Sequence, residues 1–277
     1  MGMWNLEVPR PDRWMRSVLE SSRDPRQARF LTRESLSWVV RNRAVTPWYM
    51  IRYLRFAMLK LKHPDVITEG FVFLGKDVEI RTRPGFGRIV LGPWVHIGDR
   101  NCIRSHEGTL RIGPKSVLGK DNTLNCYLDL ELGEGTLVSD WVYVADFNHV
   151  FTDIHVPIKD QGIVKAPVRI GPDCWIGAKS SVLSGVTVGR GCVVAAHALV
   201  NRDVPDYSVV VGVPARVVRN RKVDYEKAEE TRAALEDIAR KTARAVAEHR
   251  GAVEGSAASR GDADGVSSVS ASAATSV

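Results

Sequence analysis

A period of six residues runs through the middle of the chain, and it restricts the fold more than any other sequence feature. From residue 170 onward an aliphatic residue occupies every sixth position without a break: Ile170, Ile176, Val182, Val188, Val194 and Val200. The next residue is often Gly or Ala, and the fifth residue of each hexad is small or β-branched. The same spacing appears upstream, from Leu91 to Val150. Aliphatic residues placed at random would not stay in phase over so many hexads.

Each hexad predicts a short strand followed by a turn, and three hexads make one triangular coil of about 18 residues. The aliphatic position is expected to point into the prism and to stack on its counterpart one coil away. The fifth position lies near a corner, where a slim side chain fits. We therefore expect an all-β core of stacked coils over residues 66–220, with Cys174 and Cys192 as small buried thiols.

The segment before the repeats, residues 1–65, is a basic arm that we expect to be helical. It carries 13 Lys/Arg and 6 Asp/Glu, whereas residues 66–218 carry 16 of each, so the net charge of +7 resides in the arm. Thr46 and Pro47 predict a helix start. An apolar stripe follows at helical spacing: Ile51, Leu54, Met58 and Leu61. Two interpretations are open. The helix packs on the repeat domain, or it associates weakly and reversibly with an anionic membrane or an acidic acceptor.

The segments after the repeats predict a helix and then a disordered tail. Residues 221–250 are rich in Ala, Glu and Arg without Pro or Gly, which favours a C-terminal helix. Residues 251–277 contain no aromatic side chain and few residues able to form a core, so we expect disorder there.

Several classes of protein are disfavoured by the sequence. No apolar run has the length of a membrane span, no secretory signal pattern begins the chain, and the four cysteines form no CxxC pair. We therefore expect a cytoplasmic protein, with the inner membrane face as a peripheral location. No nucleic-acid motif accompanies the basic arm, so we expect no nucleic-acid partner.

Three segments resemble a known enzyme family. They are DFNHVFTDIHVPIKDQG, APVRIGPDCWIGAKSSVLSGVTVG and VNRDVPDYSVVVGVPARVVR, all within residues 146–219. The chain resembles the hexapeptide-repeat acyltransferases, in the branch of maltose, galactoside and nodulation-factor O-acetyltransferases. Over residues 66–220 the resemblance implies a left-handed parallel β-helix and a homotrimer with active sites between adjacent prisms. It also implies acyl-CoA, expected to be acetyl-CoA, as the donor and a sugar or glycan hydroxyl as the acceptor.

The chemistry of such a transfer needs a base for the hydroxyl proton and a donor for the oxyanion, and it needs no metal ion. His149 stands where the period breaks, at the start of an irregular segment over residues 151–167. The family places its catalytic base in a D-x-N-H-x-F-x-D pattern, which this chain matches at Asp146, Asn148, His149, Phe151 and Asp153. The resemblance therefore implies that His149 is the general base.

The sequence leaves the roles of the residues around His149 open. Asp146 and Asp153 are the nearby carboxylates; either one orients the imidazole or binds the sugar, or both cap backbone amides in the loop. Asn125, one coil earlier, is implied by the resemblance to contact the acyl group or the acceptor. Gln161 and Lys159 are candidates for contacts with sugar hydroxyls.

The resemblance also implies a donor site along the later coils. Its members are Trp175, Ala178, Ala196, Asn201, Arg202, Arg216 and Arg219. The indole lies beside the cleft, and the backbone amides of the two alanines bind pantetheine. Where the family has a Thr or Ser followed by Lys, this chain has Asn201 followed by Arg202, so the positive charge at the second position is kept. Arg216 and Arg219 either pair with CoA phosphates or remain solvated surface charges.

Two other functions share the same expected prism. The γ-type carbonic anhydrases bind one zinc ion with three histidines across a subunit interface, and His106, His149 and His155 have a superficially similar spacing. A non-catalytic trimeric scaffold is the other alternative. Metal analysis of the purified protein separates the first alternative from acyl transfer.

Overall fold

The computed structural model describes residues 15–16, 18–20, 23–27 and 32–261. The chain forms two separate units, which meet between Arg221 and Lys222. The first unit contains the N-terminal helices and all the strands, and the second is helical.

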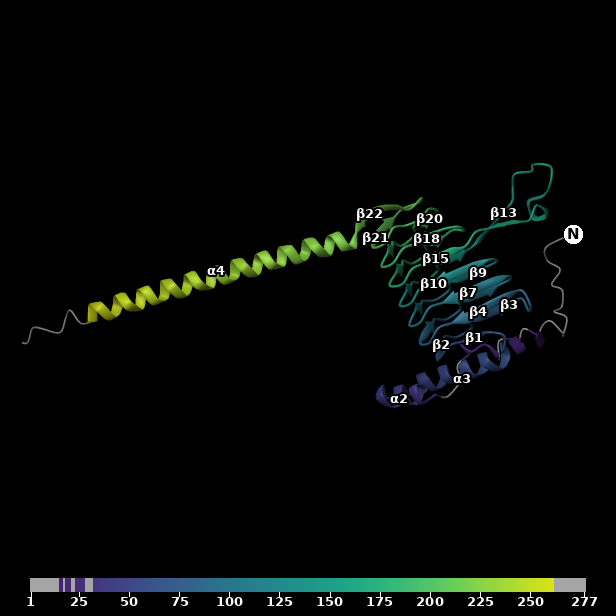
Figure 1. Ribbon diagram of the computed structural model, residues 1–277, viewed down its shortest axis with the longest axis horizontal. Helices are drawn as coiled ribbons and strands as arrows, with labels where there is room; N and C mark the ends of the chain where they lie inside the picture. Colours follow the sequence, from purple (N-terminus) through teal and green to yellow (C-terminus); the bar gives the residue numbers. More distant parts are fainter. Residues whose placement is uncertain (1–14, 17, 21–22, 28–31, 262–277) are drawn as a thin grey trace, which may run out of the picture. The chain divides into compact units, whose positions relative to one another are not determined.

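The strands of the first unit form three long sheets in the described part of the chain (Figure 1). The first sheet contains β1 (Ile67–Thr68), β4 (Gly87–Leu91), β7 (Gly108–Ile112), β10 (Asp129–Leu132), β15 (Val168–Ile170) and β18 (Thr187–Val188). The second contains β2 (Val72–Leu74), β5 (Val95–Ile97), β8 (Val117–Leu118), β11 (Leu137–Val138), β16 (Trp175–Ile176), β19 (Val193–Val194), β21 (Ser208–Val211) and β22 (Arg216–Asn220). The third contains β3 (Glu79–Thr82), β6 (Cys102–Ser105), β9 (Thr123–Cys126), β12 (Tyr143–Ala145), β17 (Ser181–Val182) and β20 (Leu199–Val200).

The chain visits the three sheets in turn, so the fold is a β-solenoid. Successive strands of each sheet pair in parallel, except for the terminal β21–β22 pair, which is antiparallel. The register aligns the aliphatic positions: Val144 lies opposite Leu124 on one side and Val182 on the other. The predicted parallel β-helix of hexapeptide repeats is therefore confirmed.

The core is a set of aliphatic columns that run along the inside of the solenoid. Ile103, Leu124 and Val144 are completely buried, and so are their counterparts in later coils. Gly177 shows why small residues follow the aliphatic position, because a Cβ atom there would lie 2.5 Å from the backbone nitrogen of Ala196. Cys174 and Cys192 are free and buried, as expected from their place in the hexad.

The N-terminal arm contributes α2 (Arg33–Arg41) and α3 (Pro47–Lys62), which lie at the end of the solenoid where β1 and β2 begin (Figure 1). The Oγ1 atom of Thr32 caps α2 by accepting from the Ser35 amide (3.1 Å). Phe56 and Leu59 are the buried residues of α3. The helix therefore packs, but not through the stripe that the sequence singled out, which remains exposed.

The second unit contains α4 (Arg221–Gly261). This helix passes the expected boundary at residue 250 and includes residues 251–261, which composition assigned to the tail. Residues 262–277 of that tail lie outside the described residues. None of the described helices has the length and hydropathy needed to cross a bilayer.

Asp146 is a buried carboxylate at the corner that follows β12. Its Oδ1 atom accepts from the Tyr127 amide (2.7 Å), and its Oδ2 atom accepts from the amides of Leu128 (2.8 Å) and Asp129 (2.7 Å). The thiol of Cys126 donates to the same Oδ2 atom (3.3 Å). Burial, followed by the negative charge of Asp146, raises the pKa of the Cys126 thiol to about 12. The Asp146 side chain thus accepts hydrogen bonds from three consecutive backbone amides in the turn of the preceding coil.

We predict that Asp146→Ala lowers the free energy of unfolding by about 3 kcal/mol, because it leaves three backbone N–H groups without their charged acceptor. Urea unfolding followed by circular dichroism measures the change. Asp160→Ala is the control, since that carboxylate pairs with Lys159 on the surface and its loss is expected to leave the midpoint of urea unfolding unchanged. Equal stability of the wild type and Asp146→Ala would contradict the role given to this carboxylate.

Candidate functional site

A hairpin interrupts the regular coils between β12 and β15, and it carries His149. Its strands are β13 (Phe147–His149) and β14 (Ile163–Lys165), which pair antiparallel, with the short 3-10 helix η1 (Ile158–Asp160) between them. Figure 1 shows this segment projecting from the stack of strands. His149 lies opposite Ile163 in the hairpin register, and its side chain is exposed. The candidate base therefore stands outside the prism.

Gln161 holds the tip of this hairpin together. Its Oε1 atom accepts from the Asp153 amide (3.1 Å). Its Nε2 atom donates to the carbonyl oxygens of Asp153 and Val156, both at 2.7 Å. Below the tip, the Val150 amide donates to the Gly162 carbonyl (3.1 Å). The sequence offered Gln161 as a sugar contact, but its amide group is already engaged with the loop backbone.

The two carboxylates considered as partners of His149 also bind backbone amides. Asp146 is committed to the preceding coil, as described above, and Oδ1 of Asp153 accepts from the His155 amide (2.8 Å). Among the described residues, no hydrogen bond joins either carboxylate to His149. Both carboxylates therefore cap backbone amides in this chain, and a role of either one toward His149 or the sugar stays a prediction.

An aromatic column leads from the third sheet to His149. The rings of His106 and Tyr127 stack with centroids 4.5 Å apart and an interplanar angle of 13°. Tyr127 contacts Phe147 (4.5 Å, 60°), and Phe147 meets His149 edge to face (5.9 Å, 80°). The column fixes the base of the hairpin against the coils, because its first two members belong to earlier turns of the solenoid.

A charged pair supports the same column. Lys165, which lies opposite Phe147 in the hairpin, pairs with Glu107, and Arg83 also approaches that carboxylate (3.5 Å). Burial, and secondarily the positive charge of Arg104, lowers the pKa of His106, while a hydrogen bond with the side chain of Asn125 acts in the opposite direction. The surroundings of His106 on balance favour its neutral form.

Asn125 lies on β9, in register with Ala145 of the next coil. Its Oδ1 atom is buried beside the imidazole of His106, and the hydrogen bond between the two side chains is at most a weak one. A ligand hydroxyl or a water that approached this oxygen would have to compete with His106. Within one chain, Asn125 lies on a strand of the third sheet, whereas His149 lies on the projecting hairpin.

Ala178 and Ala196 occupy the same corner position, after β16 and β19, in successive coils. At this corner in earlier coils, an aspartate from the next coil caps the backbone: Asp99 accepts from the Lys76 amide (2.7 Å) and Asp140 from the Lys120 amide (2.6 Å). Alanine provides no such cap. In the described part of the chain, the N–H groups of Asp99, Asp140, Ala178 and Ala196 at this corner have no acceptor, and those of the two alanines are open in successive coils.

The other predicted donor residues lie at different places on the solenoid. Trp175, on β16, is half exposed and donates from Nε1 to Ser139 Oγ (3.0 Å). Asn201 and Arg202 follow β20 and are exposed. Arg216 and Arg219 lie on β22, with exposed side chains. Within one chain, the hairpin and the Asn201–Arg202 pair follow strands of the third sheet, whereas the alanine corner follows strands of the second sheet.

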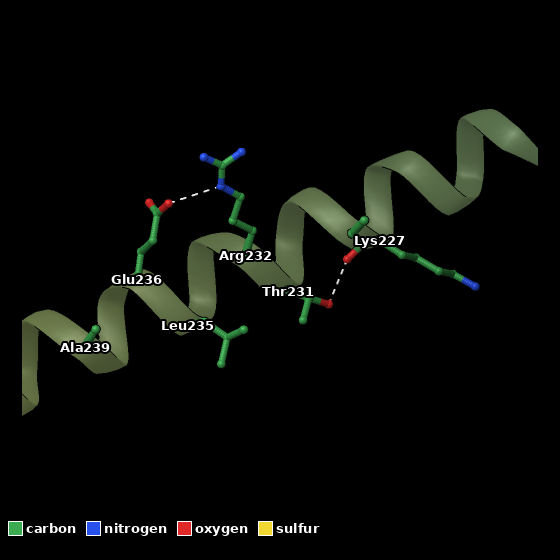
Figure 2. Close-up of a pocket in the computed structure, with 7 residues that line it drawn as sticks. Lys227, Thr231, Arg232, Leu235, Glu236 and Ala239 are labelled. Atoms are coloured by element: carbon green, nitrogen blue, oxygen red, sulfur yellow. Dashed lines mark hydrogen bonds and ion pairs between the residues drawn. The ribbon is translucent and has the colours of Figure 1, made fainter.

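Metal-ligand clusters and surface hollows were the remaining places where a site could lie among the described residues. No group of three or more His, Cys, Asp or Glu side chains is placed to hold a metal ion, so His106, His149 and His155 do not meet in one chain. The hollow in Figure 2 is lined by residues of α4 alone, around Leu235, and includes none of the predicted site residues.

The sequence interpretation missed the aromatic column and the ties that order the hairpin. His106, Tyr127 and Phe147 occupy equivalent positions in successive coils, so aligning the turn residues as well as the aliphatic ones would have found the column. The role of Gln161 has no comparable sequence signal, because it depends on how the loop folds back on itself.

Comparisons with known proteins agree with this fold. A family model described as bacterial transferase hexapeptide (six repeats) matches residues 167–202. A protein of Mycobacterium tuberculosis named as a probable acetyltransferase is 56% identical over 245 residues, which is 87% of this chain and 80% of that protein.

Two solved structures are similar to the chain at lower identity. An N-acyltransferase from Bacillus cereus, solved with dTDP and coenzyme A, has a TM-score of 0.47 and 21% identity, covering 61% of this chain and 90% of its own. A maltose O-acetyltransferase from Clostridium difficile 630 has a TM-score of 0.35 and 22% identity, covering 68% and 85%. The parallel coils, the hexad register and the extensive identity to the mycobacterial protein together show that the chain belongs to the bacterial hexapeptide-repeat transferases and is an acetyltransferase.

Proposed function

We propose that the protein transfers an acyl group, most simply acetyl, from acyl-CoA to a hydroxyl of a sugar or glycan, with His149 as general base. The observation that carries the proposal is the placement of His149. Its imidazole is exposed on a hairpin that is tied internally by Gln161 and anchored to the coils by the aromatic column. An ordered, accessible imidazole beside a rigid scaffold is what proton abstraction from an alcohol requires.

The proposed reaction balances without a metal ion. The imidazole takes the hydroxyl proton while the oxygen attacks the thioester carbonyl, and a tetrahedral oxyanion forms. The C–S bond then breaks, the carbonyl re-forms as an ester, and the proton on the imidazolium leaves with the CoA thiolate. His149 is therefore neutral again after each turnover.

The alanine corner supports acyl-CoA as the donor. The pantetheine arm carries two amide carbonyls in an extended chain, and the open N–H groups of Ala178 and Ala196 offer two donors in successive coils. Arg202 and Arg216 are exposed guanidinium groups suited to phosphates. Trp175 provides an aromatic face in the coil of Ala178.

A homotrimer explains how groups at different corners of one chain would form one site. The hairpin leaves the solenoid at one corner, after β12, and the alanines occupy another, after β16 and β19. A cleft between adjacent prisms brings the hairpin of one copy to the alanine corner of the next. We propose that Asn125, which lies on β9 beside His106, contacts the acyl group or the acceptor in such a cleft.

We expect His149→Ala to lower turnover by about 10² or more, because the attacking hydroxyl loses its base. Its affinity for CoA, measured by calorimetry, should stay within about twofold, since the alanine corner is untouched. His155→Ala, an exposed histidine on the same hairpin, is the matched control and should keep wild-type turnover. Wild-type turnover in His149→Ala would remove His149 from the mechanism.

We expect Gln161→Ala to lower turnover about tenfold by loosening the hairpin rather than by removing a substrate contact. The distinguishing measurement is amide hydrogen exchange in the protein without substrate, where the amide of Asp153 should exchange faster. Ile154→Ala is the control, because that side chain lies on the same hairpin and is 88% exposed. Unchanged exchange together with a higher KM would show instead that Gln161 binds the acceptor.

A further inference from the structure

Most of the exposed side chains of α3 are apolar. Met50, Ile51, Leu54, Met58 and Leu61 lie within about 100° of the helix circumference at 3.6 residues per turn, and all five are exposed. We name them the α3 ridge. Leu54 is 61% exposed and Leu61 80%.

The ridge is not the face by which α3 packs. Phe56 and Leu59 are buried on the opposite side, and Tyr49 and Tyr53 join the aromatic cluster around Phe73. The outer face of an ordinary surface helix is polar, because water is its only neighbour. A contiguous exposed apolar face marks a surface that meets another apolar phase.

The charges around the ridge select the chemistry of its partner. Residues 35–64 contain six Lys/Arg and no Asp/Glu. On the helix, the exposed Lys62 borders the ridge, as its spacing from Met58 requires. Arg55 lies one turn after Ile51, and one of its guanidinium nitrogens donates to the Leu74 carbonyl (3.3 Å). At its N-terminal end, the guanidinium of Arg52 lies 3.8 Å from the ring centroid of the half-exposed Trp48. An apolar face bordered by cations and tryptophan is complementary to acyl chains beneath anionic headgroups.

We infer that the α3 ridge docks the protein on the surface of an anionic membrane. The helix lies in the interface, with the ridge inserted among the upper acyl chains and the basic residues at the phosphate level. This docking is peripheral and reversible, since the ridge is one short helix face. It is independent of the proposed acyl transfer, because the ridge shares no residue with the hairpin or the alanine corner.

The test uses the full-length protein in vesicle co-sedimentation, with vesicles of phosphatidylcholine alone or with 30% phosphatidylglycerol. We expect the protein to bind the anionic vesicles and to bind the neutral vesicles only weakly. Binding to the anionic vesicles should fall steeply as NaCl rises from 0.05 to 1 M, because the electrostatic screening length is only about 3 Å at 1 M.

Two variants separate the apolar contribution to vesicle binding from the electrostatic one. The double variant Leu54→Gln/Leu61→Gln should weaken vesicle partitioning about tenfold, because two apolar side chains no longer insert among the acyl chains. Lys62→Gln should weaken it about fivefold through the loss of one interfacial charge. The matched controls are in α4: Leu235→Gln, whose side chain is likewise 61% exposed and projects from the helix in Figure 2, and Lys241→Gln. Both controls should bind like the wild type.

Each alternative occupant predicts a different result. If a second copy or another segment of this chain covers the ridge, wild-type protein will not bind either vesicle, and the double leucine variant will change the mass or the melting temperature instead. Either result would overturn the proposal. Binding that ignores lipid charge and survives 1 M NaCl would also overturn it, because the basic border would then contribute nothing.

Discussion

The structure depends on the stacking of aliphatic side chains between successive coils. A single coil of three short strands cannot bury its own apolar residues, and its backbone groups need a neighbour above and below. The columns that contain Ile103, Leu124 and Val144 meet both requirements, because parallel pairing brings equivalent residues into contact while it satisfies the ladder hydrogen bonds. The N-terminal end of the stack also needs a cover, which α3 supplies through Phe56 and Leu59.

A scaffold of this kind makes its corners available for function. The interior of the prism is filled, so a binding residue has to lie on an outer face, at a corner or on an insertion. The hairpin that carries His149 leaves from a corner where Asp146 has already satisfied the backbone of the coil below. At another corner, neither Ala196 nor Gly212 in the following coils carries a capping carboxylate, and the N–H groups of Ala178 and Ala196 are open. Both features arise from small changes in a repeated unit rather than from a separate domain.

The sequence predicted the repeats and their core because a strict period determines which side of each strand faces inward. It also predicted where the period breaks, and hence the position of His149. It did not predict which face of α3 packs, because Phe56 and Leu59 compete with an equally apolar stripe on the other side. Nor did it predict the use of Asp146, since an aspartate beside a histidine is equally suited to orienting the ring and to capping amides. The contrast between Asp99 or Asp140 and the two alanines was visible in the sequence, but it acquires meaning only once the coils are in register.

The central claim is that this solenoid moves an acyl group from a thioester to a hydroxyl. The most direct measurement is incubation of the purified protein with labelled acetyl-CoA and fractionated cell glycans, with free CoA and label in the glycan measured together. The account predicts equimolar release of CoA and a label that mild alkali removes, as it does from an ester. Label that resists alkali, as an amide does, or CoA release with no label in any glycan fraction, would contradict it.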